Sequence, residues 1–277
     1  MSKLEVLCVT MHQKDYYKKF KEMNLQSDVV FANQTDSYNY EEGEINGYKV
    51  KMISTSQRGV GKNRNTALLH ASGDICIFAD DDVRYFDGYV EGILSAFEKV
   101  PEADILIFNI SSSNSQRRQK QNDSVKRCRI WNVLGYGTFR IAFRLNKIKM
   151  ANVWFTQLFG GGCIYPSGED SLWLIESLKK GLKIYTYPLN IGIVNQEEST
   201  WFKGFDDEYF FGRGALIQAA LPKVKYLMLI YYLIRFRKIS MLSMTDMIKF
   251  IRAGMRAYKL SQSFSEWKIT NAPTKSV

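Results

Sequence analysis

The sequence has few of the residues that build metal centres or covalent frameworks. Its 277 residues include two histidines and four cysteines, and none of the cysteines forms a CxxC pair. These counts argue against a zinc site and against a disulfide framework. Cys8 and Cys76 lie in apolar segments, where free cysteine behaves as a small core residue. We therefore expect a reducing compartment, the cytoplasm.

Long apolar segments are also missing. A membrane-spanning helix needs about 20 apolar residues, and the nearest candidate, residues 226–236, is too short. Residues 1–5 continue directly into a strand-like segment and lack the apolar core of a signal peptide. The sequence therefore predicts neither a spanning helix nor a leader.

Acidic residues are outnumbered. There are 28 of them against 38 lysines and arginines, which gives a net charge of +10. This excess predicts an anionic partner, either a nucleotide, a nucleic acid or an acidic membrane face. The alternative is a basic surface that only keeps the protein soluble. The hydrophobic content of 45% and the chain length suit either one large α/β domain or one domain with a helical appendage.

Strand and helix patterns alternate along most of the chain, and such alternation predicts βαβ units. We predict an α/β fold with a doubly wound, mostly parallel sheet in an α/β/α arrangement over residues 1–200. A helical, basic C-terminal extension is expected over residues 201–277, and a polar loop over residues 111–129. The predicted strands are 4–10, 29–32, 47–53, 75–79, 105–108 and 182–185, and the predicted helices are 13–22, 62–72, 88–98 and 170–180.

Three adjacent carboxylates, Asp80, Asp81 and Asp82, follow the apolar strand 75–79. Ligands of open α/β sheets bind beyond the carboxyl ends of the strands, and clustered carboxylates require a cation or full solvation. We predict that Asp80 and Asp82 bind Mn²⁺ or Mg²⁺, because alternate residues of an extended chain point the same way. Asp82 is expected nearest the metal. The alternative is a solvated acidic turn.

The helix before this triplet begins with a basic, glycine-containing segment, residues 58–65. Helix N-termini favour anions, and Arg58, Lys62 and Arg64 add positive charge. The spacing is not that of a phosphate-binding Walker loop. An ordinary basic helix start is the alternative.

The order of these segments resembles glycosyltransferase family 2, whose members have the GT-A fold. The family pattern has an Arg-Asn pair on a helix, an apolar strand leading into a D-x-D motif, and a Glu-Asp pair that opens a later helix. In this chain the corresponding residues are Arg64-Asn65, the triplet 80–82 and Glu169-Asp170. The resemblance extends from residue 4 to about residue 199 and implies a GT-A-like fold.

The resemblance also implies a function. It indicates an inverting, metal-dependent transfer from a nucleotide-diphosphate sugar, with a UDP-sugar as one candidate, to a saccharide or lipid-linked acceptor in surface polysaccharide or glycolipid synthesis. Asp170 would be the general base and Asp82, with Asp80, the metal ligand. A helix N-terminus keeps a carboxylate ionised, and burial raises its pKa towards the working pH. Predicted substrate-binding residues are Asn33, Arg64, Asn65, Asp80, Asp81 and Glu169.

Asn33 departs from the family pattern, because an acidic residue that meets the nucleotide base often stands there. Arg213 is a further candidate for contact with a diphosphate. The glycines at 160–162 permit either a close backbone approach or a lid. The basic, apolar segments 223–238 and 249–259 suit either the inner face of an anionic membrane or packing on the catalytic domain or another subunit.

Two other classes of protein are alternatives. A sugar nucleotidyltransferase usually has a glycine-rich loop with an arginine after its first strand, and residues 10–14 do not fit that pattern. A non-catalytic nucleic-acid-binding protein suits the charge, but the basic residues are spread out and form no aromatic-basic module. We therefore expect no nucleic acid partner.

Overall fold

The computed structural model describes residues 2–114, 119–195 and 204–271, and ten strands of these residues form one sheet. The order across the sheet is β3-β4-β2-β1-β5-β9-β7-β10-β6, and β8 pairs with β10. The strands are β1 (Leu4–Met11), β2 (Asp28–Gln34), β3 (Asn39–Ile45), β4 (Tyr48–Thr55), β5 (Ile75–Asp80), β6 (Val83–Tyr85), β7 (Ile105–Ser112), β8 (Lys126–Arg127), β9 (Ile141–Arg144) and β10 (Ile184–Val194).

Most of the sheet is parallel, as the sequence predicts. Strands β4, β2, β1 and β5 run parallel to one another, and β7 runs parallel to β10. Strand β9 lies antiparallel between β5 and β7, and β3, β6 and β8 are also antiparallel to their neighbours. These four strands were not predicted. Strand β3 is an exposed, glutamate-rich edge, and the other three contain only two to four residues, so none carries a strong apolar pattern.

Helices cover both faces of the sheet. Helices α1 (Tyr16–Glu22) and α3 (Tyr89–Lys99) pack on one face, and α2 (Val60–His70), α4 (Leu145–Ala151) and α5 (Glu169–Lys179) pack on the other. Successive residues of a strand serve the two cores in turn, since side chains alternate across a strand. In β1, Val6 and Cys8 face the α1 and α3 side, and Leu7 faces the other. The predicted α/β/α arrangement is confirmed.

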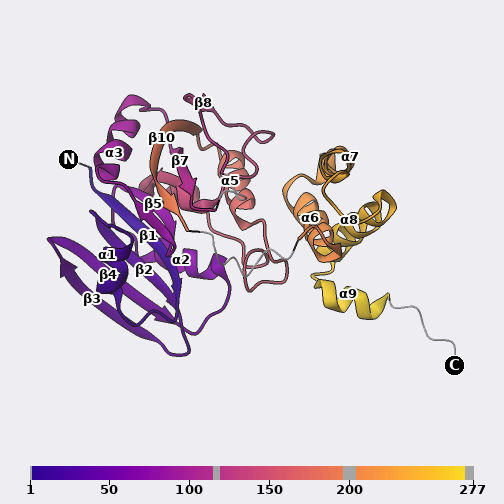
Figure 1. The fold of residues 1–277 in the computed structure, drawn as a ribbon, viewed down its shortest axis with the longest axis horizontal. Helices are drawn as coiled ribbons and strands as arrows, with labels where there is room; N and C mark the ends of the chain where they lie inside the picture. Colours follow the sequence, from indigo (N-terminus) through magenta and orange to yellow (C-terminus); the bar gives the residue numbers. More distant parts are fainter. Residues whose placement is uncertain (1, 115–118, 196–203, 272–277) are drawn as a thin grey trace.

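The C-terminal helices lie together at one end of the molecule (Figure 1). They are α6 (Asp207–Ala220), α7 (Lys225–Phe236), α8 (Met244–Lys259) and α9 (Phe264–Thr270). Helices α6 and α8 cross in close contact, because a Cβ atom on Gly214 would lie 2.0 Å from the carbonyl oxygen of Ile251. A Cβ atom on Gly254 would lie 1.9 Å from the carbonyl oxygen of Phe211. Glycine is therefore required at both positions.

The helical extension packs against α5 and the segment before it. Phe211, Ala215 and Leu216 of α6 belong to the same apolar core as α2 and α5. The prediction of a helical extension is confirmed, and α6 packs on the catalytic domain. The predicted domain boundary at 200/201 falls within 196–203 and lies outside the described residues. Within the predicted loop 111–129, β7 continues to Ser112 and β8 is a short strand, and residues 115–118 are outside the description.

Candidate active site

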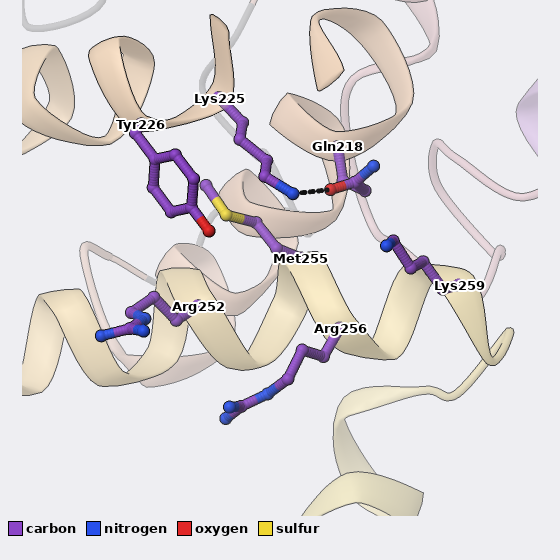
Figure 2. Close-up of a pocket in the computed structure, with 7 residues that line it drawn as sticks. All are labelled: Gln218, Lys225, Tyr226, Arg252, Met255, Arg256 and Lys259. Carbon is purple, nitrogen blue, oxygen red and sulfur yellow. Dashed lines mark hydrogen bonds between the residues drawn. The ribbon is translucent and has the colours of Figure 1, made fainter. Parts of the chain in front are cut away.

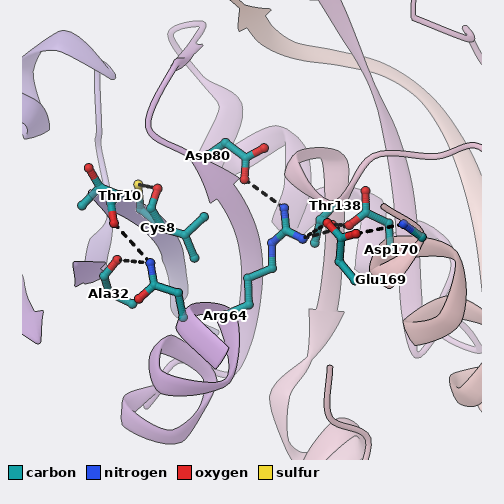
Figure 3. A network of polar contacts seen from close by, with 11 residues as sticks. Cys8, Thr10, Ala32, Arg64, Asp80, Thr138, Glu169 and Asp170 are labelled. Atoms are coloured by element: carbon teal, nitrogen blue, oxygen red, sulfur yellow. Dashed lines mark hydrogen bonds and ion pairs between the residues drawn. The ribbon is translucent and has the colours of Figure 1, made fainter. Parts of the chain in front are cut away.

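Arg64, in α2, lies at the centre of the candidate site, and only 5% of its side chain is exposed. Its Nη2 atom lies 3.1 Å from Oδ1 of Asp80, the last residue of β5. Its Nη1 atom lies 2.9 Å from Oε1 of Glu169 and 2.9 Å from Oδ1 of Asp170, at the start of α5 (Figure 3). One guanidinium group therefore joins the Arg-Asn pair, the acidic triplet and the Glu-Asp pair.

The neighbours of Arg64 fix its position. The side-chain amide of Asn63 donates to the carbonyl oxygens of Thr10 and Ala32, at 3.2 and 2.7 Å, and so ties α2 to β1 and β2. The side chain of Asn65 donates to the carbonyl oxygen of Phe155 at 2.9 Å and accepts from its N–H at 2.8 Å. The sequence Asn-Arg-Asn therefore anchors α2 on both sides of the arginine.

Asp170 combines burial with nearby negative charge. Burial and then Glu169 raise the pKa of the Asp170 carboxyl to about 7, although Arg64 and a hydrogen bond from Thr138 act in the opposite direction. The Thr138 hydroxyl donates to Oδ1 of Asp170 in a short hydrogen bond. The other oxygen of Glu169 accepts from the Gly168 N–H at 3.0 Å. A carboxylate with a pKa near 7 is suited to accept a proton at neutral pH.

The acidic triplet lies at the end of the central strand β5. Asp81 accepts a short hydrogen bond from the hydroxyl of Thr10, and its carbonyl oxygen accepts from Nζ of Lys19 at 3.4 Å. Asp82 lies at the surface, but neighbouring protein atoms exclude part of the water around its carboxyl group. This desolvation and then the charges of Asp80 and Asp81 raise the pKa of Asp82 to about 7. Burial raises the pKa of Asp80 as well, against the effect of Arg64.

The residues of the triplet fit a divalent cation. Carboxylate oxygens are the donors that Mg²⁺ and Mn²⁺ prefer, and Mg²⁺ usually takes one or two protein carboxylates together with substrate phosphates. The mutual repulsion that raises the pKa of Asp82 is what a cation would relieve. Within the described ranges, no group of three or more His, Cys, Asp or Glu side chains gathers closely enough to hold a metal by itself.

The side chains of two predicted substrate-binding residues, Asn33 and Asn65, form hydrogen bonds with backbone atoms. Asn33 is buried, its Oδ1 accepts from the N–H of Gln13 at 3.0 Å, and its amide donates to the carbonyl oxygen of Gln13 at 2.9 Å and to Ser54 at 3.0 Å. Asn65 is occupied by Phe155 in the same way. These contacts argue against direct substrate binding by either side chain. The buried amide of Asn33 is stable only when it is hydrogen-bonded, and the half-buried amide of Asn65 forms two hydrogen bonds with Phe155, so both residues position the loops beside the site.

Arg213, in α6, lies beside the turn that precedes α5. Its guanidinium stacks 4.7 Å above the ring of Tyr209, and Nη2 lies 3.3 Å from the hydroxyl of Ser167. Its Nε atom is buried without a hydrogen-bond partner among the described residues. The predicted arginine therefore lies near Glu169-Asp170 in space and retains a donor that is not used by the described chain.

The glycine segment 160–162 packs against the start of α2. The N–H of Val60 donates to the carbonyl oxygen of Gly161 at 3.0 Å. Gly160 has a φ of +107°, and a Cβ atom there would lie 2.5 Å from the Val60 side chain and 3.0 Å from the Glu169 carboxyl carbon. Here the glycine permits a close approach that positions Glu169.

Sequence reasoning missed Thr138, Thr10 and Lys19. Thr138 belongs to the short 3-10 helix Thr138–Arg140, just before the unpredicted strand β9. No motif marks it, and only the neighbouring strand brings it to Asp170. Thr10 ends the predicted first strand, at the sheet edge where ligands of α/β folds bind, and that position was the one available signal.

One protein-family model matches a part of the chain. Residues 34–159 match the family model for glycosyl transferase family 2. The predicted resemblance to this family is confirmed over these residues. A search of curated protein sequences finds no match.

The fold resembles that of S. aureus TarS. The structure of TarS 1–349 in complex with UDP-GlcNAc superposes with a TM-score of 0.60 at 12% identity, over 95% of this chain and 93% of that chain. TarS 1–349 alone gives a TM-score of 0.58 at 13% identity, with the same coverage. The complex of TarS 1–349 with UDP gives 0.56 at 13% identity, over 98% of this chain and 76% of that chain. The predicted GT-A-like fold is confirmed.

Proposed function

We propose that the protein is an inverting, metal-dependent glycosyltransferase that moves a sugar from a nucleotide-diphosphate sugar to an acceptor hydroxyl. The observation that carries the proposal is the contact of one buried arginine with both Asp80 and Asp170. The contact supports the proposal because Asp80, a predicted metal ligand, and Asp170, the predicted base, share the same cation. The family match and the TarS-like fold support the same reaction class.

Asp170 acts as the general base. Its carboxylate accepts the proton of the acceptor hydroxyl while the acceptor oxygen forms a bond to the anomeric carbon. The bond from that carbon to the diphosphate oxygen breaks, and its electron pair leaves with the nucleoside diphosphate. A single displacement of this kind inverts the anomeric configuration. Arg64 and Thr138 orient the carboxylate through the contacts described above.

Asp82 and Asp80 would hold Mn²⁺ or Mg²⁺. When bound, this ion supplies positive charge to the departing diphosphate. Arg213 is a candidate for contact with a phosphate oxygen, because its Nη2 atom lies 3.3 Å from Ser167 in the turn before α5 and guanidinium matches phosphate geometry. Asp81 keeps the end of β1 in place through Thr10.

A UDP-sugar is the first donor to test, because structures of the TarS neighbour contain UDP-GlcNAc and UDP. The acceptor is proposed to be a saccharide or a lipid-linked saccharide of surface polysaccharide synthesis. This part of the proposal rests on the family resemblance.

The test is a thermal-shift screen of UDP-, GDP- and dTDP-sugars, with and without Mn²⁺, followed by measurement of nucleoside diphosphate release. Asp82→Asn should lose the Mn²⁺-dependent part of both signals and keep its fold. Asp123→Asn, which removes an exposed carboxylate elsewhere, is the matched control. Turnover of a nucleoside triphosphate with a sugar phosphate, and none of a nucleotide sugar, would overturn the proposal in favour of a nucleotidyltransferase.

A further inference from the structure

Helix α7 has an apolar row that faces away from the rest of the protein. One side of the helix packs inward through Leu229 and Leu233, which are buried. The outward residues recur every three or four positions and share one face, as the helical repeat requires. They are Tyr226 (61% exposed), Leu227 (67%), Ile230 (51%), Tyr231 (53%) and Ile234 (62%).

A basic pocket adjoins the start of this row. It has a volume of about 130 Å³ and lies between α6, α7 and α8. Figure 2 shows Lys225 and Tyr226 coming from α7, with Arg252, Arg256 and Lys259 on α8. Among the described residues no aspartate or glutamate lines it, and Nζ of Lys225 donates to Gln218 at 3.3 Å. The pocket therefore suits a phosphate group, because it offers several cationic donors and no competing carboxylate.

The positive charge continues along α8. Lys249, Arg252, Arg256 and Lys259 recur at helical spacing, and none of them forms an ion pair with a carboxylate of the described residues. A second hollow on α8 is lined by Lys249, Arg252 and Arg256 together with Thr245 and Ile248. Uncompensated cations on one helix face produce a field that attracts anionic surfaces.

Tyr226 joins the two features, because it belongs to the apolar row and also lines the basic pocket. An exposed apolar row beside cations is the pattern of a surface that lies in the interface of an anionic bilayer. We propose that α7 and α8 dock the protein on an anionic phospholipid membrane, with lipid phosphates at the basic pocket and the α7 row among the acyl chains.

Charge complementarity favours a membrane over a second copy of the chain. A two-fold symmetric contact through this face would place like charges opposite one another, which costs free energy. None of the described helices is by itself long and apolar enough to cross a bilayer. Helix α6 with residues 222–236 passes the length and composition criteria as a pair that is bent by 117°. The proposal is that the protein docks on the surface of the bilayer, and it does not require a helix that crosses the bilayer.

The test is co-sedimentation of the full chain with vesicles of phosphatidylcholine alone or mixed with phosphatidylglycerol. Binding should require phosphatidylglycerol and weaken in high salt. Arg252→Gln with Arg256→Gln should weaken binding roughly 30-fold, at about fivefold per basic residue. Lys49→Gln with Lys147→Gln removes the same charge from exposed positions of the catalytic domain and should bind as the parent chain does.

The apolar row is tested separately. Leu227→Ser with Ile230→Ser alters only exposed side chains, so the fold should persist, and vesicle binding should fall at least tenfold. Equal binding of the parent chain to neutral and anionic vesicles would overturn the proposal. So would a loss of vesicle binding in the Lys49 and Lys147 control that equals the loss in the Arg252 and Arg256 variant. Sedimentation velocity that finds a dimer, abolished by the Leu227 and Ile230 changes, would overturn it in favour of self-association. Nucleoside diphosphate release with a soluble acceptor is measured independently, so failure here is distinct from failure of the proposed function.

Discussion

Nη1 of Arg64 lies 2.9 Å from Oδ1 of Asp170, although 106 positions separate the two residues in the chain. The same arginine contacts Asp80 and Glu169, so a single cation faces three carboxylates. Two of these carboxylates are the predicted base and a predicted metal ligand. Arg64 is therefore a positioning residue that links the two halves of the proposed reaction, and its contacts lead to the predictions below.

Asp170→Asn should lower turnover by roughly 10²- to 10⁴-fold, the usual contribution of a general base. The amide has nearly the same shape and cannot accept the proton from the acceptor. Binding of the nucleotide sugar, measured by calorimetry, should be retained. Glu176→Gln, on the exposed side of the same helix, is the control and should leave turnover unchanged. Normal turnover of Asp170→Asn would assign the base elsewhere.

Arg64→Met should destabilise the fold by about 3–5 kcal/mol, because it leaves buried carboxylates without a counter-charge. Urea unfolding measures this loss. The folded-state pKa values of the carboxyls rise in the variant, so the folded state binds protons more tightly than the unfolded state. The loss of stability should accordingly be smaller at pH 5 than at pH 8. Arg64→Lys keeps the positive charge, so its free energy of unfolding should fall less than that of Arg64→Met. Equal stability of the parent chain and both variants would contradict the role of Arg64 as the counter-charge of these carboxylates.

The pH profile of kcat/KM should report Asp170. Its pKa is raised to about 7, and only the ionised form can accept a proton. At saturating Mn²⁺, kcat/KM should therefore rise through pH 7 and level off above it. Glu169 is the main charge that raises this pKa, so Glu169→Gln should move the rising limb to lower pH. Glu98→Gln, an exposed change on α3, should leave the profile in place. A limb that does not move with Glu169→Gln would indicate that another group titrates.

Gly160→Ala should reduce both stability and turnover. The backbone there has a φ of +107°, and the added Cβ atom would press on Val60 and on the carboxyl carbon of Glu169. Backbone strain of this kind costs about 1–3 kcal/mol, and the contact adds to it. Gly135→Ala is the matched control, since Gly135 also has a positive φ, +85°, but has nothing within 4 Å of the added atom. If both variants lose the same stability and turnover, the close contact has no role.

Much of the fold could be predicted because its signals are local. Strands β1, β5 and β7 are buried on both faces of the sheet, so their sequences are almost continuously apolar and can be recognised as buried strands. Strand β9 could not be predicted, because four residues carry no periodicity and its place between β5 and β7 is a long-range pairing. The position of Thr138 could not be predicted either, because Thr138 lies directly before β9.

The sequence indicated which carboxylates lie near the candidate site, but it did not indicate the hydrogen bonds that surround them. Acidic residues after a buried strand and at a helix start are local patterns, and the structure brings Asp80 and Asp170 to one arginine. The hydrogen bonds of Asn33 and Asn65 were not predictable, since both partners come from loops whose paths the sequence does not encode locally. A family position alone suggested substrate contact for both, and the observed contacts point to loop positioning.

The sequence by itself determined the layered α/β plan, the basic charge and the presence of carboxylates after a buried strand and at a helix start, because periodicity and residue type are properties of short segments. Tertiary structure decided which carboxylates share a cation, which amides are used internally, and which face of α7 remains uncovered. Those outcomes depend on contacts between residues far apart in the chain, and the geometry of such contacts exists only after the sheet and its helices have packed.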